Sequence, residues 1–194
     1  KLNTEANVNN REFSDATRIF VATGSLPVIP RIPGIDNPNV INVLDAHRNI
    51  SSVMGEKVVI CGGGMSGCEL ALELAEKGKK AAVVDMLPTV AGDAARFNGI
   101  TLMTKLAKLG VEIVANTKVK EFVPDAVVAE RDGKEIRIPA DTIVHAFGIR
   151  PNNTLGMEML KAYPGKVLVI GDADKVNCIY DAVHAGYNAA ASLL

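Results

Sequence analysis

The sequence has no tryptophan and little aromatic character of any kind, since Phe, Tyr and Trp make up 4% of its 194 residues. It also lacks an excess of either charge, with 21 basic and 22 acidic residues and a formal net charge of -1. Such a balance offers no field for nucleic acid or an anionic membrane. No apolar run approaches the roughly 20 residues that span a bilayer, and the polar opening contains no signal-peptide core. These absences predict a cytoplasmic protein without nucleic-acid or membrane partners.

Cysteine is scarce as well, with Cys61, Cys68 and Cys178 as the three examples. They form neither a C-x-x-C nor a C-x4-C redox pair and no zinc-ligand cluster, so we expect reduced, packed thiols and no disulfide-reductase activity. We predict no metal site, because the histidines lack a matching cysteine or carboxylate pattern. Structural or surface roles are therefore expected for His47, His145 and His184.

What the sequence does contain is an alternation of strand-like and helix-like segments, which predicts an α/β fold with a parallel sheet and helices on both faces. Short alternating runs between residues 118 and 138, turning at Asp132 and Gly133, predict a small antiparallel β-meander. The Pro- and Gly-rich stretch 24–39 is expected to be an irregular connection. Strands are predicted at 18–23, 57–61, 81–85, 111–114, 141–148 and 166–172, and helices at 66–77, 94–109 and 179–194.

A glycine-rich turn follows the strand predicted at 57–61, with Gly62, Gly64 and Gly67 in a G-x-G-x-x-G spacing. In such turns the first glycine allows a sharp bend, the second lets a pyrophosphate approach, and the third permits close helix packing. Amides at the start of the following helix would face the phosphates. Strand, turn, helix and strand fall within about 30 residues, as in a Rossmann-like FAD/NAD(P)-binding fold.

An acidic residue, Asp85, ends the second strand of this unit, close to the roughly 20 positions beyond the glycines expected of a ribose-binding acid. Its carboxylate can accept hydrogen bonds from ribose hydroxyls and would repel a 2′-phosphate. No arginine follows in the next several positions, "MLPTVAGDAA". We therefore expect NAD(H) to be preferred over NADP(H). The alternative is a tight turn within an α/β sheet followed by a surface aspartate.

Several phrases resemble flavoproteins with paired dinucleotide-binding domains, and among them the C-terminal part of NADH:flavin oxidoreductases of the 2-enoate reductase and 2,4-dienoyl-CoA reductase family, related to old yellow enzyme. Besides the glycine turn, these phrases are "KLNTEA", "VATGSLPVIPRIPGID", "GKKAAVVDM", "KLGVEI", "DTIVHAFGIRPNN" and "VLVIGDAD". Together they cover nearly the whole chain. They are specific to the superfamily and less specific to this one family.

The resemblance implies an NAD-binding domain at residues 50–149, inserted into a discontinuous and partial FAD-binding domain formed by 1–49 and 150–194. The glycine motif of the FAD domain is expected upstream of Lys1. Also implied are an upstream FMN and iron-sulfur cluster outside this chain, which would make the chain an inactive fragment of an NADH-dependent flavoprotein oxidoreductase.

The resemblance also implies roles for individual residues. Glu69 corresponds to an acid near the nicotinamide, Met65 to a residue covering the nicotinamide pocket, and Asp172 to a ligand of the FAD ribityl and pyrophosphate. From the residues alone, Glu69 could be a solvated charge and Asp172 the start of a turn. We predict no catalytic side chain. The predicted cofactor-binding residues are Gly62, Gly63, Gly64, Met65, Ser66, Gly67, Glu69, Asp85, Met86 and Gly148 for NAD, and Ala22, Thr23, Gly24, Gly171 and Asp172 for FAD.

The function implied is hydride transfer from NADH to FAD, with the electrons going on to reduce an enoate or enoyl-thioester at a centre outside this chain. One alternative is an NADH oxidase or a ferredoxin or rubredoxin reductase built on the same domains. Another is a nucleotide-binding module without turnover. The chain departs from the usual G-D-C return motif, since "GDADKVNC" follows its last strand, and this departure leaves the flavin contacts after Asp172 open.

Overall fold

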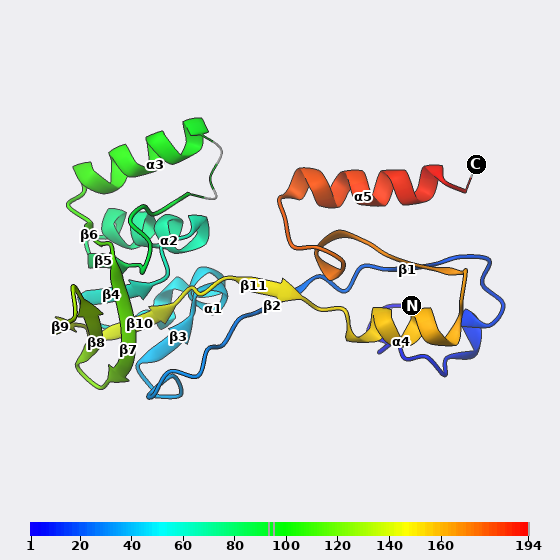
Figure 1. The fold of residues 1–194 in the computed structure, drawn as a ribbon, viewed down its shortest axis with the longest axis horizontal. Coiled ribbons are helices and arrows are strands. Elements are labelled where there is room, and N and C mark those ends of the chain that lie inside the picture. Colours follow the sequence, from blue (N-terminus) through cyan, green and yellow to red (C-terminus); the bar gives the residue numbers. More distant parts are fainter. Residues whose placement is uncertain (93, 95, 194) are drawn as a thin grey trace. The chain divides into compact units, whose positions relative to one another are not determined.

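The computed structural model describes residues 1–92, 94 and 96–193. The chain forms two compact units (Figure 1). Unit 1 comprises Lys1–Val28 and Ile149–Leu194, and unit 2 comprises Ile29–Gly148. Residue 95, which falls within the helix predicted at 94–109, lies outside the described residues.

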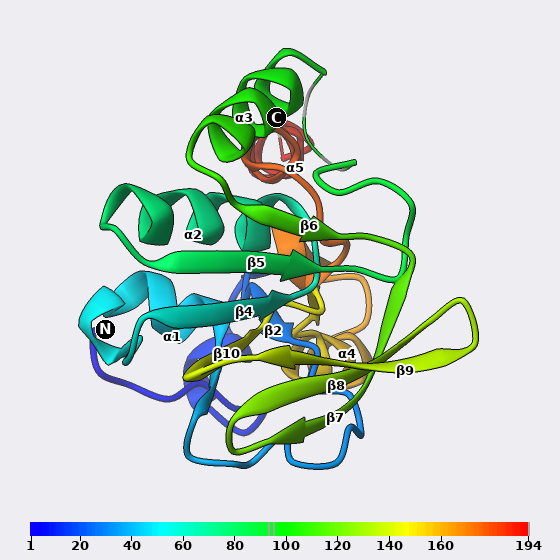
Figure 2. The ribbon, with the colours of Figure 1, turned by 90° about the vertical axis from the view of Figure 1, so that its left-hand side faces the viewer.

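Unit 2 is built on a five-stranded sheet in the order β3-β10-β4-β5-β6, and all of its neighbouring strands run parallel (Figure 2). The chain moves outward from β4 through β5 to β6 and later returns to place β10 on the other side of β4. The strand order therefore reverses next to β4, and ligands of open α/β sheets bind outside the carboxyl ends of strands at such a point. The sheet strands are β3 (Val40–Asn42), β4 (Lys57–Cys61), β5 (Lys80–Val84), β6 (Glu112–Val114) and β10 (Thr142–His145).

The two faces of this sheet are covered by different structures because side chains alternate along each strand. On β4, Val58 and Ile60 belong to the core formed with three helices, whereas Val59 and Cys61 face the meander. The expectation of helices on both faces is therefore wrong for unit 2. The apolar face of the meander, including Phe122, buries the second side instead. The three helices are α1 (Val43–Arg48), α2 (Met65–Glu76) and α3 (Arg96–Lys108).

The predicted antiparallel meander is present as β7 (Thr117–Val123), β8 (Ala126–Arg131) and β9 (Lys134–Pro139). Asp132 and Gly133 connect β8 to β9 with φ values of 53° and 72°. Positive φ at both central residues is the signature of the type I′ hairpin that the Asp-Gly pair favours.

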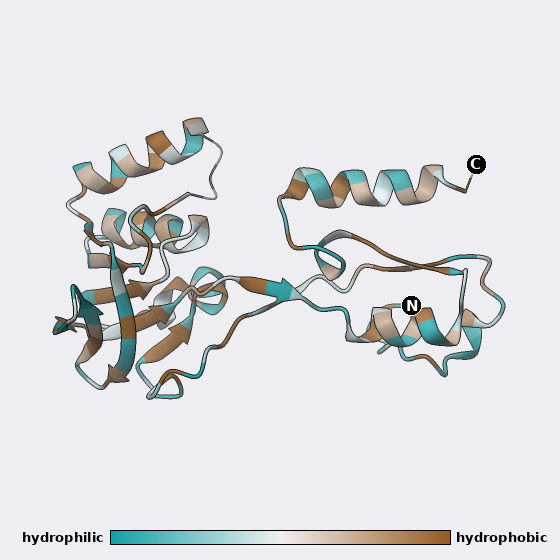
Figure 3. Cartoon of the chain, in the orientation of Figure 1, coloured by the Kyte–Doolittle hydropathy of each residue, from teal (hydrophilic) through white to brown (hydrophobic). Residues whose placement is uncertain are grey.

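Unit 1 contains a parallel pair, β1 (Ile19–Val21) with β12 (Val167–Val169), and an antiparallel pair, β2 (Ser25–Pro27) with β11 (Ile149–Pro151). Helix α4 (Thr154–Ala162) packs on the parallel pair, and helix α5 (Ile179–Ala191) follows a 3-10 turn at Gly171–Ala173. Figure 3 shows polar and apolar residues mixed along α5. Of the helices in the described part of the chain, none has the length and apolar character needed to cross a membrane.

The structural units do not begin and end at the sequence-based boundaries. Residues 29–49 lie in unit 2, because β3 pairs with β10 and α1 packs against α2. The stretch predicted to be irregular contains β2, and its last residues lead into β3. Short elements such as β3, α1 and α4 carry too little periodicity to be recognised from sequence.

Asp141 fastens the beginning of β10 to the beginning of β4. Its Oδ2 accepts the backbone N–H groups of Glu56 and Lys57, both at 2.8 Å, and its own N–H donates to the Lys57 carbonyl at 2.8 Å. The two hydrogen bonds to the carboxylate stabilise its charged form and lower the pKa of Asp141.

We expect Asp141→Asn to lower the melting temperature at neutral pH, because an amide group replaces one acceptor oxygen with a donor. A depressed folded-state pKa stabilises the fold above the unfolded-state pKa of about 3.9, and that contribution disappears as the pH falls through the folded-state pKa. The difference from the parent protein should therefore shrink as the pH falls below the unfolded-state pKa. Thermal melts across pH, with the exposed Asp36→Asn as control, test this; a gap independent of pH would contradict it.

Candidate nucleotide site

The glycine turn brings backbone atoms of three segments into direct contact at the carboxyl end of β4. Gly62 has a φ of 115°, and a Cβ on it would lie 2.2 Å from the carbonyl oxygen of Ala146, which follows β10. A Cβ on Gly67 would lie 2.2 Å from the carbonyl oxygen of Gly62. Both distances are far below van der Waals contact. Helix α2 therefore approaches the turn to a distance that only glycine at these two positions permits.

Asp85 follows β5 and its carboxylate points into the same turn. Oδ2 accepts the N–H of Gly63 at 2.6 Å, and Oδ1 accepts the N–H of Leu87 at 2.7 Å. One bond on each oxygen fixes the orientation of the carboxylate, and a carboxylate oxygen has a second lone pair for a ligand. The side chain is half-buried, so the charge is held in place at the edge of the sheet with acceptor capacity remaining.

The segment after Asp85 folds back over the glycine turn. Ala91, at a φ of 53°, donates its N–H to the carbonyl of Gly63 at 2.6 Å. Val90 is buried there, and a Cβ on Gly63 would lie 2.4 Å from the Val90 side chain. Gly63 is thus required for packing of the loop that follows Asp85.

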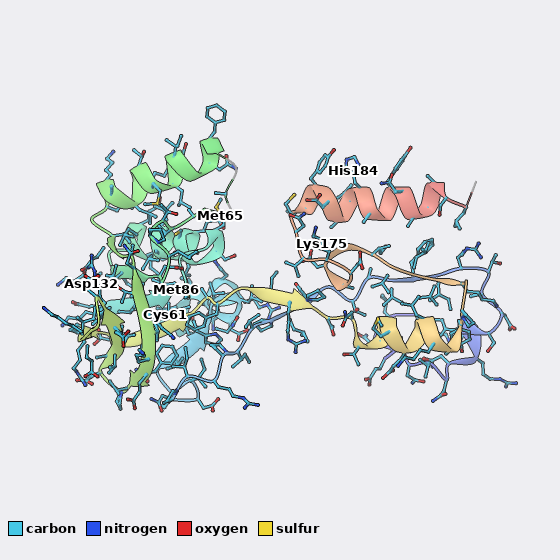
Figure 4. All side chains as sticks on the ribbon, viewed as in Figure 1. Cys61, Met65, Met86, Asp132, Lys175 and His184 are labelled. Carbon is cyan, nitrogen blue, oxygen red and sulfur yellow. The ribbon has the colours of Figure 1, made fainter. Side chains whose placement is uncertain are left out.

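A cavity of about 580 Å³ opens beside Asp85 at the carboxyl ends of β4, β5 and β10. Its walls are mainly apolar, with Asp85 and Lys118 as the charged residues among those that line it. Met86 is 67% exposed and lies at this cavity, labelled in Figure 4. The lining residues include Pro30, Ile32, Gly62, Gly64, Val84, Leu87, Thr117, Val119, Ala146, Phe147 and Gly148.

The predicted residues on α2 lie next to the turn but outside the described lining of this cavity. Met65 is half-buried, while Ser66 and Glu69 are exposed on the first turns of the helix. The carbonyl of Ser66 lies 3.2 Å from Nε2 of His47, on α1. The structure therefore gathers Gly62, Gly64, Asp85, Met86 and Gly148 around one space and leaves Ser66 and Glu69 open to solvent at its side.

Lys118 and Phe147 also line the cavity but were absent from the sequence-based set. Lys118 is the second residue of β7, four positions beyond the end of β6, and Phe147 lies two positions beyond the end of β10. Their position at strand carboxyl ends was the available signal, although it gives no indication of which of several residues would face the space.

The residues predicted to bind FAD lie in unit 1, where they surround the end of β12. Asp172 is half-buried; its Oδ2 accepts the hydroxyl of Ser25 at 3.3 Å and its Oδ1 accepts the N–H of Asn177 at 3.3 Å. The hydroxyl of Thr23 donates to the carbonyl of Asn152 at 2.5 Å. The exit segment (Ala22, Thr23 and Gly24) and the return segment (Gly171 and Asp172) are therefore connected through Ser25.

A second cavity of about 580 Å³ lies at the opposite, amino-terminal edge of the unit 2 sheet. It is lined by Lys57, Lys79, Lys80 and Glu112 among others, and by none of the described residues of the glycine turn. Because ligands of open α/β sheets bind at the carboxyl edge, the cavity beside Asp85 is the better candidate for a ligand site.

The cysteines differ in their surroundings. Cys61 and Cys68 are buried in separate clusters on the two faces of the sheet, and burial raises the pKa of the Cys61 thiol well above its usual range. The expectation that all three thiols are packed is wrong for Cys178, which is exposed before α5 with its Sγ 2.7 Å from Oδ2 of Asp181. It lies in the connection between the 3-10 turn at Gly171–Ala173 and α5, and connecting segments run over the surface.

His145 is buried at the end of β10, with Nδ1 3.4 Å from Nδ2 of Asn42. Burial lowers its pKa, partly opposed by the charge of Asp45. A neutral imidazole that accepts from Asn42 fits the structural role predicted from sequence. His47 lies at the surface of α1, and His184 is exposed on α5, with its ring tilted against that of Tyr180 and the ring centroids 4.0 Å apart.

A family model described as pyridine nucleotide-disulphide oxidoreductase matches residues 1–183. The NADH oxidase of Thermoanaerobacter brockii is 38% identical over 179 residues, covering 89% of this chain and 27% of the relative. The cinnamate reductase of Clostridium sporogenes is 32% identical over 197 residues, covering 100% of this chain and 29% of the relative. The chain thus spans less than a third of the length of these two curated relatives.

Among solved structures, 2-naphthoyl-CoA reductase in complex with 2-naphthoyl-CoA superposes with a TM-score of 0.85 at 34% identity. The match covers 96% of this chain and 28% of that one. These comparisons confirm the predicted α/β, Rossmann-like fold and the resemblance to flavin-dependent reductases.

We expect Gly67→Ala to destabilise unit 2 by about 1–3 kcal/mol, as overpacking of a tight contact does. The added methyl group would push α2 away from the Gly62 carbonyl. Urea unfolding followed by circular dichroism measures the change. Gly99→Ala on α3, where a new Cβ has its nearest neighbour at 3.4 Å, is the matched control and should be neutral or stabilising. Equal stability of the two variants would show that the contact at Gly67 is not tight.

Proposed function

The chain belongs to the pyridine nucleotide-disulphide oxidoreductase family, and on that premise we propose that unit 2 binds NADH in the cavity beside Asp85. The observation that carries this proposal is the anchored carboxylate of Asp85, which stands next to the glycine turn with acceptor capacity to spare. The apolar walls of the cavity suit an adenine ring, and Gly64, the second glycine of the turn, lets a pyrophosphate approach the backbone.

Each group of residues has a separate task in this proposal. Asp85 accepts hydrogen bonds from ribose hydroxyls and repels a 2′-phosphate, so NADH is preferred over NADPH. Gly62, Gly63, Gly64 and Gly67, with the amides that open α2, hold the pyrophosphate. Met65, Ser66 and Glu69 on the first turns of α2 adjoin the nicotinamide, and Met86 and Gly148 close the ends of the site.

Flavin binding is proposed for unit 1 of the intact protein. Asp172, oriented by Ser25 and Asn177, accepts from FAD hydroxyls, while Ala22, Thr23, Gly24 and Gly171 bring the backbone close to the flavin nucleotide. When bound, NADH supplies a hydride from nicotinamide C4 and FAD accepts it at N5. The side chains of this chain bind and orient the two nucleotides, and none is required as a general acid or base.

The electrons then leave for a centre outside this chain, which we propose reduces an enoate or enoyl-thioester. An FMN and an iron-sulfur cluster at that centre belong to the same proposal. Similarity to a cinnamate reductase and to a 2-naphthoyl-CoA reductase supports this route. An NADH oxidase is the second candidate, because an enzyme of that name is 38% identical to the chain. Both candidates need the same NADH site in unit 2.

We expect the purified chain to bind NADH more tightly than NADPH, and Asp85→Ala to weaken NADH binding by about tenfold, the loss of one or two charge-assisted hydrogen bonds. Isothermal titration calorimetry measures both affinities directly. Glu135→Ala, which removes an exposed carboxylate on the meander, is the control and should leave binding unchanged. If neither nucleotide binds the folded parent chain, unit 2 is not the NADH site proposed.

We also expect the chain alone to bind NADH without consuming it, because it carries a single glycine fingerprint and lacks one for FAD. Following nicotinamide absorbance with and without added FAD tests this expectation. Steady NADH oxidation by the flavin-free chain would contradict it. Turnover by a protein that joins this chain to a segment with an FAD glycine fingerprint would argue against a non-catalytic nucleotide-binding module.

A further inference from the structure

Two opposite charges line the cavity from different parts of unit 2. Asp85 follows β5, and Lys118 lies on β7 after the chain has passed through α3 and β6. Two backbone hydrogen bonds hold these segments together: the N–H of Thr117 donates to the Asp85 carbonyl at 2.8 Å, and the N–H of Asn116 donates to the Leu87 carbonyl at 3.1 Å. The placement of Lys118 beside Asp85 is therefore fixed by the backbone and does not depend on side-chain contact.

The ammonium group of Lys118 is available for a ligand. Its cross-strand neighbour is Glu130, but Glu130 pairs instead with Lys120, whose Nζ lies 3.0 Å from Oε2. The pairing of β7 with β8 shifts register between Val119 and Glu121, which places Lys120 at a bulge. Within the described part of the chain, Lys118 is exposed and makes no ion pair within 4.0 Å.

The two charges also differ in mobility. The carboxylate of Asp85 is held by two amides, whereas Lys118 carries its charge on a flexible stem with several rotatable bonds. A phosphate on the adenosine ribose would meet a fixed negative charge first. Lys118 lines the same cavity on a side chain that can change direction.

We propose that Lys118 is a specificity-determining residue: it is the cation that contacts a 2′-phosphate in this cavity, and the Asp85 carboxylate alone keeps NADPH from using it. This inference rests on the proposed binding of NADH in the same cavity. The loop after β5 contains no arginine, so the cation that would contact a 2′-phosphate comes from the meander instead. Removal of the Asp85 carboxylate then opens the site to NADPH.

Calorimetric titrations of NADH and NADPH into the parent chain and three variants, Lys118→Met, Asp85→Ser and the double variant, test the proposal. Serine at position 85 retains an oxygen that can accept one of the two backbone N–H groups, and melting curves establish that each variant is folded. Lys120→Met is the matched control, because it removes a lysine from the same strand that pairs with Glu130 and lies outside the described lining of the cavity.

Asp85→Ser should raise the affinity for NADPH relative to NADH by about tenfold or more, since one charge-assisted contact to phosphate replaces a repulsion. Adding Lys118→Met should remove that gain, about tenfold, while leaving NADH binding unchanged. The gain should also decrease with added salt, as for any exposed ion pair. Lys120→Met added to Asp85→Ser should have no effect on the ratio.

If Asp85→Ser does not fold, Asp85→Asn with and without Lys118→Met makes the same comparison, because asparagine removes the charge while keeping an acceptor oxygen on a side chain of the same size. If adding Lys118→Met to the folded Asp85 variant leaves the ratio of NADPH to NADH affinity unchanged, with NADH still bound, Lys118 does not have the proposed role. The proposed function would then still stand. Failure of the folded parent chain to bind NADH would overturn the proposed function and this inference with it.

Discussion

Contact of backbone with backbone at the carboxyl end of β4 is the constraint on which the rest of the site depends. The carbonyl oxygens of Ala146 and Gly62 occupy the positions where side chains of Gly62 and Gly67 would begin. Strand β4, helix α2 and the segment after β10 therefore meet at distances that no other residue types allow. Because these three segments are brought this close, the N–H of Gly63 lies within reach of Asp85. The position of the Asp85 carboxylate at the site thus depends on packing without Cβ atoms.

The same arrangement separates a rigid part of the site from an adaptable one. The carboxylate of Asp85 is oriented by amides on either side, and the loop that follows it is fixed to the turn through Ala91. A preorganised acceptor of this kind costs little to align when a ligand hydroxyl arrives. Lys118 has no such anchor among the described residues. In the proposed site, discrimination between nucleotides is then expected to come mainly from the fixed Asp85 carboxylate, while the mobile Lys118 side chain adjusts to the nucleotide that binds.

The parts of this molecule that the sequence predicted well are those governed by local chemistry. The apolar run of β4, the glycine spacing and the Asp132-Gly133 turn each depend on neighbours a few residues away, and the structure confirms the elements they indicate. Contributions from distant segments were not predictable. Lys118 reaches the cavity only because β7 is bonded to the residues after β5, and no periodicity records that pairing. The meander covers one face of the unit 2 sheet where helices were expected, for a similar reason. The strands of a sheet have the same apolar pattern whether a helix or a meander covers them.

The two units differ in how completely their apolar surfaces are buried. Unit 2 has core clusters on both faces of its sheet, so the strands that carry the proposed site are packed on both sides. Unit 1 has a small cluster around Val21 and Met159, and α5 contributes no buried residue. Its exposed apolar side chains include Ile179, Tyr180, Val183 and Tyr187. Since burial of apolar surface is the main source of stability, unit 2 carries the stability of the nucleotide site proposed for it, whereas the residues proposed for flavin rest on a smaller core. Measurements of nucleotide binding therefore report first on unit 2.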